Sequence, residues 1–144
     1  MGTLNFVSIA QARSYSGQSD FINEKFIQKQ RRILKYKEEL GLNLKQIEKI
    51  EALKINLEKE MVLIDAKIEV VNIELRAILS QDETDIKTVN ELIDQKSALE
   101  ETKAKAQAMA YVNLKEVLTP DQRVNLNSFR EIYKGPYKDS DGNQ

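Results

Sequence analysis

The chain of 144 residues carries 22 Lys and Arg against 23 Asp and Glu, and 41% of its residues are hydrophobic. This length suits one domain, and the hydrophobic fraction is sufficient for a core without implying a membrane span. The balanced charge argues against a general nucleic-acid binder, which needs excess basic side chains to contact phosphates. With 31% charged and 6% aromatic residues, the composition favours an all-α fold of long amphipathic helices.

The sequence lacks both Cys and His, and their absence limits its chemistry. Thiol nucleophiles, imidazole acid–base catalysis and Cys/His zinc sites all need those side chains. Because there is also no Gly-rich phosphate loop, we expect the protein not to be an enzyme and to need no cofactor. The carboxylates Asp82, Glu83 and Asp85 could hold a hard cation weakly, but an acidic first turn of a helix explains them better. No metal site is therefore predicted.

Residues 1–19 differ in character from the rest of the chain. The apolar stretch from Leu4 to Ala12 ends in Ala-Gln-Ala, a small-x-small pattern of the kind that signal peptidase cleaves. We interpret it as the end of a signal peptide whose basic start is missing, with Met1 to Thr3 as a cloning start. The polar residues after it predict disorder through residue 19.

The remaining chain divides into a helical domain over 20–135 and a disordered tail over 136–144. A first helix is expected over 21–40, where apolar residues recur near the helical period of 3.6. Gly41 is a natural residue to end it, because glycine adopts a positive φ without penalty.

Charge is distributed unevenly between this first helix and the middle of the chain. Residues 21–46 include seven basic and three acidic side chains, whereas 47–118 include ten basic and fifteen acidic ones. The two segments either pair with each other through solvated helix faces or expose a surface for an acidic partner.

The strongest pattern in the chain predicts a long second helix over 47–79. Its apolar residues are spaced by three or four, like the a and d positions of a coiled coil: Ile47, Ile50, Leu53, Leu57, Met61, Ile64, Ile68, Val71, Leu75 and Ile78. Five more apolar residues lie off this seam: Ile55, Val62, Leu63, Val70 and Ile73. Because one partner helix would not need them, we expect a second apolar contact.

A polar run over 80–85 ends this periodicity. Asp82 or Thr84 is expected to cap a third helix over 85–118, and the short connection predicts that it runs antiparallel to the second helix. Its alanine-rich middle either permits close packing or lines a shallow groove. A fourth helix is expected over 120–133.

Two short stretches share the form Leu-cap-x-x-Gln. In LTPDQ, Thr119 can accept the N3 amide hydrogen and Gln122 can return a bond from the cap's own N–H, which together make a capping box. In LNLKQ, Asn43 and Gln46 stand in the same relation. One such box only begins a helix and stabilises it by about 1 kcal/mol. Two boxes on either side of a long helical hairpin form a more specific pattern: Leu42, Asn43, Gln46, Leu118, Thr119 and Gln122.

This pattern resembles the LTxxQ family of bacterial periplasmic proteins, which includes Spy, CpxP, ZraP and CnrX. The resemblance covers Leu40 to about Tyr133, with Asn43 in place of the family's Thr. It implies a four-helix hairpin whose long central helices pair two subunits into a curved, cradle-shaped homodimer. It also implies a periplasmic protein exported by a signal peptide.

The same resemblance implies a role in the envelope stress response. Family members hold unfolded clients without ATP or bind the periplasmic domain of a sensor kinase, so we expect one of these activities here. By the family's pattern, the candidates for client binding are Leu40, Leu42 and Ile50, which are equally suited to core or dimer contacts.

Two alternatives to this function stay open. One is a metal-responsive sensor of the same family, although nickel, cobalt and zinc sites favour the imidazole ligands that this chain lacks. The other is a generic coiled-coil adaptor without client activity, which the apolar spacing of the second helix would support equally well.

Overall fold

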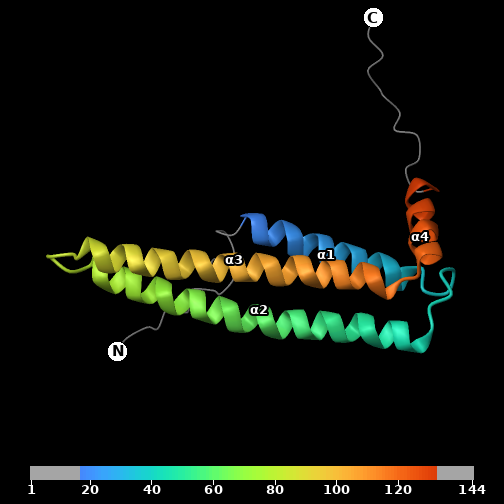
Figure 1. The fold of residues 1–144 in the computed structure, drawn as a ribbon, viewed down its shortest axis with the longest axis horizontal. Helices are drawn as coiled ribbons and strands as arrows, with labels where there is room; N and C mark the ends of the chain where they lie inside the picture. Colours follow the sequence, from blue (N-terminus) through green and yellow to red (C-terminus); the bar gives the residue numbers. More distant parts are fainter. Residues whose placement is uncertain (1–16, 133–144) are drawn as a thin grey trace, which may run out of the picture.

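The structure, a computed structural model, describes residues 17–132. Four helices make up its regular structure: α1 (Gly17–Lys35), α2 (Leu44–Leu79), α3 (Ile86–Val117) and α4 (Pro120–Ile132). Since these residues contain no strand, the all-α prediction is confirmed for this part of the chain. Figure 1 shows α2 and α3 side by side and running in opposite directions, with α1 along part of α3 and α4 turning away after it.

The apolar seam predicted for α2 faces the other helices. All ten of its positions are buried or half-buried, and the fully buried ones recur every seven residues: Ile50, Leu57, Ile64 and Val71. The five apolar residues off the seam are instead exposed, by 48% to 68%: Ile55, Val62, Leu63, Val70 and Ile73. At 100° per residue, most of these lie on the side of the helix opposite the seam. One face of α2 is therefore packed, while a second apolar face is left uncovered by the rest of residues 17–132.

The first helix ends earlier than expected. α1 stops at Lys35, and residues 36–41 form separate turns before α2. The last of these turns is closed by two bonds, from Leu42 N–H to the carbonyl of Lys37 and from Gly41 N–H to that of Glu38. This is a Schellman arrangement, which needs a positive φ at its C′ residue, and Gly41 supplies it with φ of 66°. The positive φ expected of Gly41 is therefore present, but this residue closes the turn after α1 and does not end α1 itself.

The cap of α3 is not the one that was predicted. Asp85 caps this helix by accepting a hydrogen bond from Lys87 N–H at 3.1 Å, so the expectation of Asp82 or Thr84 was wrong. Thr84 instead donates its hydroxyl hydrogen to the carbonyl of Gln81 in the preceding turn. Several short polar side chains in this run can all cap a helix, and only the path of the turn decides between them.

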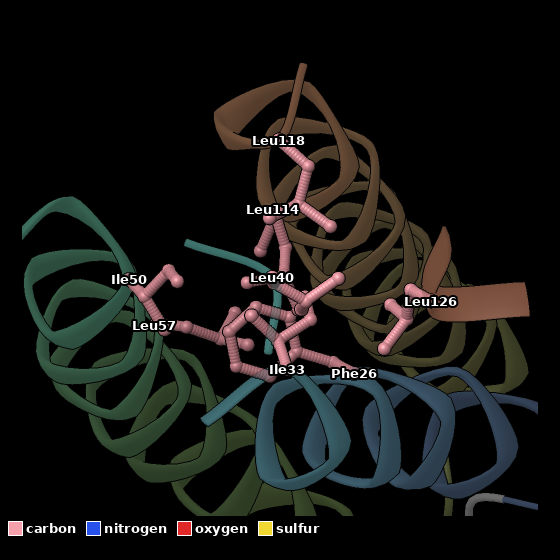
Figure 2. Packing of buried hydrophobic residues seen from close by; sticks show 9 residues of the cluster. Phe26, Ile33, Leu40, Ile50, Leu57, Leu114, Leu118 and Leu126 are labelled. Carbon is pink, nitrogen blue, oxygen red and sulfur yellow. The ribbon is translucent and has the colours of Figure 1, made fainter. Parts of the chain in front are cut away.

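The core lies where α1, α2, α3 and the start of α4 meet. Figure 2 shows its buried side chains converging from all four helices and from the α1–α2 connection. The cluster consists of Phe26, Ile33, Leu40, Ile50, Leu57, Ala110, Leu114, Leu118 and Leu126. Towards the α2–α3 turn, where α1 no longer covers the pair (Figure 1), the buried apolar residues are fewer: Ile64, Val71, Val89 and Leu92. The molecule is therefore thick and well packed at one end and two helices thick at the other.

The predictions for the two ends of the chain concern mainly residues that the structure does not describe. The expected signal-peptide remnant falls within residues 1–16 and the expected disordered tail within 136–144, both outside the described residues. α1 begins at Gly17, three residues before the expected start of the helical domain, and Asp20 in its first turn favours the helix through the dipole. Within residues 17–132, no helix has both the length and the apolar character needed to cross a membrane.

Candidate functional site

Both expected capping boxes are formed. At the start of α2, the side-chain oxygen of Asn43 accepts from Gln46 N–H at 2.9 Å, and Gln46 Oε1 accepts from Asn43 N–H at 3.0 Å. At the start of α4, Thr119 Oγ1 accepts from Gln122 N–H at 3.2 Å, and Gln122 Oε1 accepts from Thr119 N–H at 2.9 Å. Each box satisfies one N–H of its helix start and the N–H of its cap residue.

The two boxes are also bonded to each other, which the sequence did not indicate. Gln46 Nε2 donates to Gln122 Oε1 at 2.7 Å and to the carbonyl of Val117, the last residue of α3, at 2.9 Å. Gln122 Nε2 donates to the carbonyl of Leu40, in the turn after α1, at 3.1 Å. Carbonyls at the end of a helix or turn lack partners within it. Gln46 therefore caps the start of α2 and binds the end of α3, whereas Gln122 caps the start of α4 and binds the turn before α2.

This crossed arrangement ties together two connections that are far apart in sequence. The α1–α2 turn and the α3–α4 turn are held at one end of the molecule by side chains separated by 76 residues. The leucines that precede the caps add apolar contact, because Leu118 is 2% exposed and Leu42 packs against the core. We call this set of bonds, made by Asn43, Gln46, Thr119 and Gln122, the clamp; it holds the two turns together at the thick end of the fold.

Two of the three candidate client-binding residues do not form a surface. Leu40 is 6% exposed and Ile50 is fully buried, and both belong to the core cluster. Leu42 is half-buried against that cluster. The core alternative therefore describes Leu40 and Ile50 correctly, because they lie beneath the clamp and fill the space between helices.

Most of the exposed large apolar side chains lie elsewhere, along the two long helices. On α2 they include the off-seam residues from Ile55 to Ile73, and on α3 they include Ile86, Ile93, Met109 and Val112. Apolar side chains exposed in number along a helix face are suited to contact with another molecule. The signal for this surface was present in the sequence as apolar residues that the seam did not use.

A groove of about 1200 Å³ lies between α1 and α2. It exists because α1 packs along α3 and has few contacts with α2, so that α3 forms its floor. From α3, Lys103 and the buried Gln107 reach this floor, and Lys103 Nζ lies 2.6 Å from Asp65 of α2. Lys103 and Gln107 belong to the alanine-rich middle of α3, for which close packing and a shallow groove were both left open; its alanines are not among the residues that line this groove. Periodicity alone could not locate the groove, because only the relative placement of the two wall helices leaves the gap.

Residues 20–129, whose side chains are described, offer no group of three or more acidic residues placed to hold a metal ion. Of the three carboxylates in the polar run before α3, Asp85 is engaged as the α3 cap. On the exposed side of α2, the hydrogen bond from Arg76 to Glu69, at 2.8 Å, lowers the pKa of the Glu69 carboxyl. This is an ordinary surface ion pair and gives no sign of acid–base chemistry.

The comparisons with known proteins add no relative to this description. No family model, no curated protein and no solved structure matches the chain.

Proposed function

We propose that the chain is a periplasmic protein of the LTxxQ type and that it binds unfolded clients, or the periplasmic domain of a sensor kinase, without ATP. The observation that carries the proposal is the crossed bonding of Gln46 and Gln122 between two capping boxes. A single box is ordinary helix punctuation. The two boxes here share their leucine, cap and glutamine positions and are hydrogen-bonded to each other. Together these features support membership of the LTxxQ family more strongly than the spacing of the motifs alone.

The exposed apolar surface supports a binding role. Chaperones that act without ATP need apolar side chains available to an unfolded chain, with nearby charge to keep the complex soluble. The five off-seam residues of α2, exposed by 48% to 68%, meet the first need. Charged residues exposed among them on α2, such as Lys59, Glu60, Lys67 and Glu69, meet the second.

We further propose that two copies pair through this second apolar face of α2 to give a curved, cradle-shaped homodimer. α2, with 36 residues, is about 54 Å long at 1.5 Å per residue, which provides an extended contact for a partner helix. In this arrangement part of the apolar surface is covered by the second copy and the rest stays available to a client.

Light scattering of an aggregating client tests the chaperone-like activity. The protein, at a one-to-one ratio to a chemically denatured client, is expected to slow aggregation at least about twofold. The Val62→Ser, Leu63→Ser variant should lose most of this effect, because it removes two exposed apolar side chains. The Asn90→Ser, Asn125→Ser variant, altered at exposed polar positions, is the matched control and should retain it. If the unmodified protein leaves aggregation unchanged, the chaperone proposal fails.

The same surface also favours a second candidate, a coiled-coil adaptor. An uncovered apolar stripe on a long helix is suited to docking another helix. An adaptor would self-associate or bind one partner helix but would give no protection to unrelated unfolded clients. Protection of two unrelated clients would therefore exclude the adaptor as the only function.

A further inference from the structure

The groove between α1 and α2 is open to water and is lined by apolar side chains together with a larger number of polar and charged ones. Ile27 and Leu34 line it from α1, while Met61 and Val62 line it from α2. The first three are half-buried and Val62 is 68% exposed. An apolar ligand placed between the two helices would remove this surface from water, which favours binding in proportion to the area covered. The groove thus offers a few apolar side chains between two walls that carry polar and charged ones.

Charge along these walls is distributed by sign. Because α1 and α2 run in opposite directions (Figure 1), the start of α1 lies beside the middle of α2. Asp20 and Glu24 of α1 therefore share one end of the groove with Asp65 of α2. Lys103 from the floor pairs with Asp65, and Gln28 donates a hydrogen bond to Glu24. Among the described residues that line this end, carboxylates therefore outnumber ammonium groups.

The other end of the groove carries positive charge. Arg31 of α1 and Lys54 of α2 line it, and Lys54 lies 3.8 Å from Glu58, one turn farther along α2 towards the acidic end. A ligand lying along the groove would meet carboxylates at one end and cationic side chains at the other. Complementary charge fixes the direction in which such a ligand binds.

We propose that this groove binds an amphipathic helix of a client, apolar along one side, with basic residues at one end and acidic residues at the other. The inference rests on the proposed chaperone-like function and names the class of client segment it takes. The wall from Asp20 to Leu34 spans about 21 Å at 1.5 Å per residue, or about four helical turns. A client helix of that length would lie in the groove as a fourth helix packed against α1, α2 and α3, as in helix-in-groove recognition.

Three synthetic peptides of 15 residues test the proposal. All share one apolar stripe; the first has lysines at one end and glutamates at the other, the second only lysines and the third only glutamates. Fluorescence anisotropy of labelled peptides is expected to show the first binding at least about fivefold more tightly than either of the others, since several exposed charge pairs together supply a factor of this size. Equal affinity for all three would overturn the proposal.

Charge reversal on the protein locates the contact. The Arg31→Glu, Lys54→Glu variant should weaken binding of the mixed-charge peptide at least about fivefold and strengthen binding of the all-lysine peptide. The Lys67→Glu, Lys87→Glu variant carries the same change in net charge at exposed positions outside the groove, and it should keep the original order of affinities. Circular dichroism verifies that both variants keep their helices. An identical loss in the control would place the contact elsewhere and overturn the proposal.

The aggregation assay separates this inference from the function on which it rests. If the unmodified protein protects clients but the peptides bind without charge preference, the groove proposal fails and the chaperone proposal stands. If the peptides and variants behave as expected but no client is protected, the groove binds as proposed and the chaperone function fails.

Discussion

Gln46 and Gln122 use both ends of their amide groups. The oxygen of each accepts the N–H of its own cap residue, and the NH₂ group of each donates to a carbonyl of another segment. Asp or Glu at these positions would lose the donors, and a shorter side chain would not reach. The choice of glutamine at N3 is therefore explained by the contact between the two motifs, in addition to the capping of one helix.

Replacing either glutamine by alanine should destabilise the fold by about 2 kcal/mol, because each change removes a cap bond and leaves a carbonyl of the partner segment without its donor. The double variant should be less destabilised than the sum of the single variants by about 1 kcal/mol, since the two side chains share a bond. Urea unfolding measures all three. The Asn43→Thr variant keeps a capping oxygen and should change stability by less than about 0.5 kcal/mol. Strict additivity would contradict a shared clamp.

Gly41 is the residue whose backbone conformation the clamp requires. Its φ of 66° closes the turn before α2. In the same turn, the carbonyl of Leu40 accepts a hydrogen bond from Gln122. A methyl group would have space, because no atom beyond Gly41 and its two chain neighbours lies within 4 Å of an added Cβ. Gly41→Ala should therefore destabilise through backbone strain alone, by about 1 kcal/mol, and Gly41→Asn should be less harmful because Asn tolerates this region better. Thermal unfolding compares them; equal stability of all three proteins would refute the strain argument.

Among the elements, α2 was the most predictable and α1 the least. Apolar residues spaced by three and four lie on one side of a helix, and that side is buried whichever helix packs against it. The sequence therefore predicted the buried positions of α2 well. The end of α1, the Asp85 cap and the groove depend on how segments far apart in the chain are placed. The bond between Gln46 and Gln122 belongs to the same class, because capping chemistry is local and contact across 76 residues is not.

The α2–α3 pair should be least stable near its turn. Among the described residues, only α2 and α3 pack together around Val71 and Val89, whereas Leu57 and Leu114 belong to a cluster to which four helices contribute side chains. Local opening requires less free energy where fewer apolar contacts break. Hydrogen exchange at low protein concentration should therefore be at least about tenfold faster for central α2 amides near residue 71 than for those near residue 57. Equal protection in a monomeric sample would show that the two-helix segment is stabilised in some other way.

At the scale of the whole molecule, α2 presents two apolar sides, and within the part of the chain that the structure describes only the first is covered. Val70 and Ile73 are 54% and 53% exposed, so placing glutamates there should leave the folded monomer nearly unchanged. In a dimer formed through this face the same charges would lose hydration without gaining partners, which is strongly unfavourable. The Val70→Glu, Ile73→Glu variant should therefore be monomeric at concentrations where the unmodified protein is dimeric.

Sedimentation velocity over a hundredfold range of concentration measures this difference. The Asn90→Glu, Asn125→Glu variant adds the same two charges at exposed polar positions and should dimerise as the unmodified protein does, which separates the loss of apolar contact from general charge repulsion. Dimerisation should also slow hydrogen exchange near residue 71, because the second copy covers the weakest part of the pair. If the unmodified protein stays monomeric throughout, the second apolar face of α2 is left for clients or other partners, and the cradle-shaped dimer is refuted.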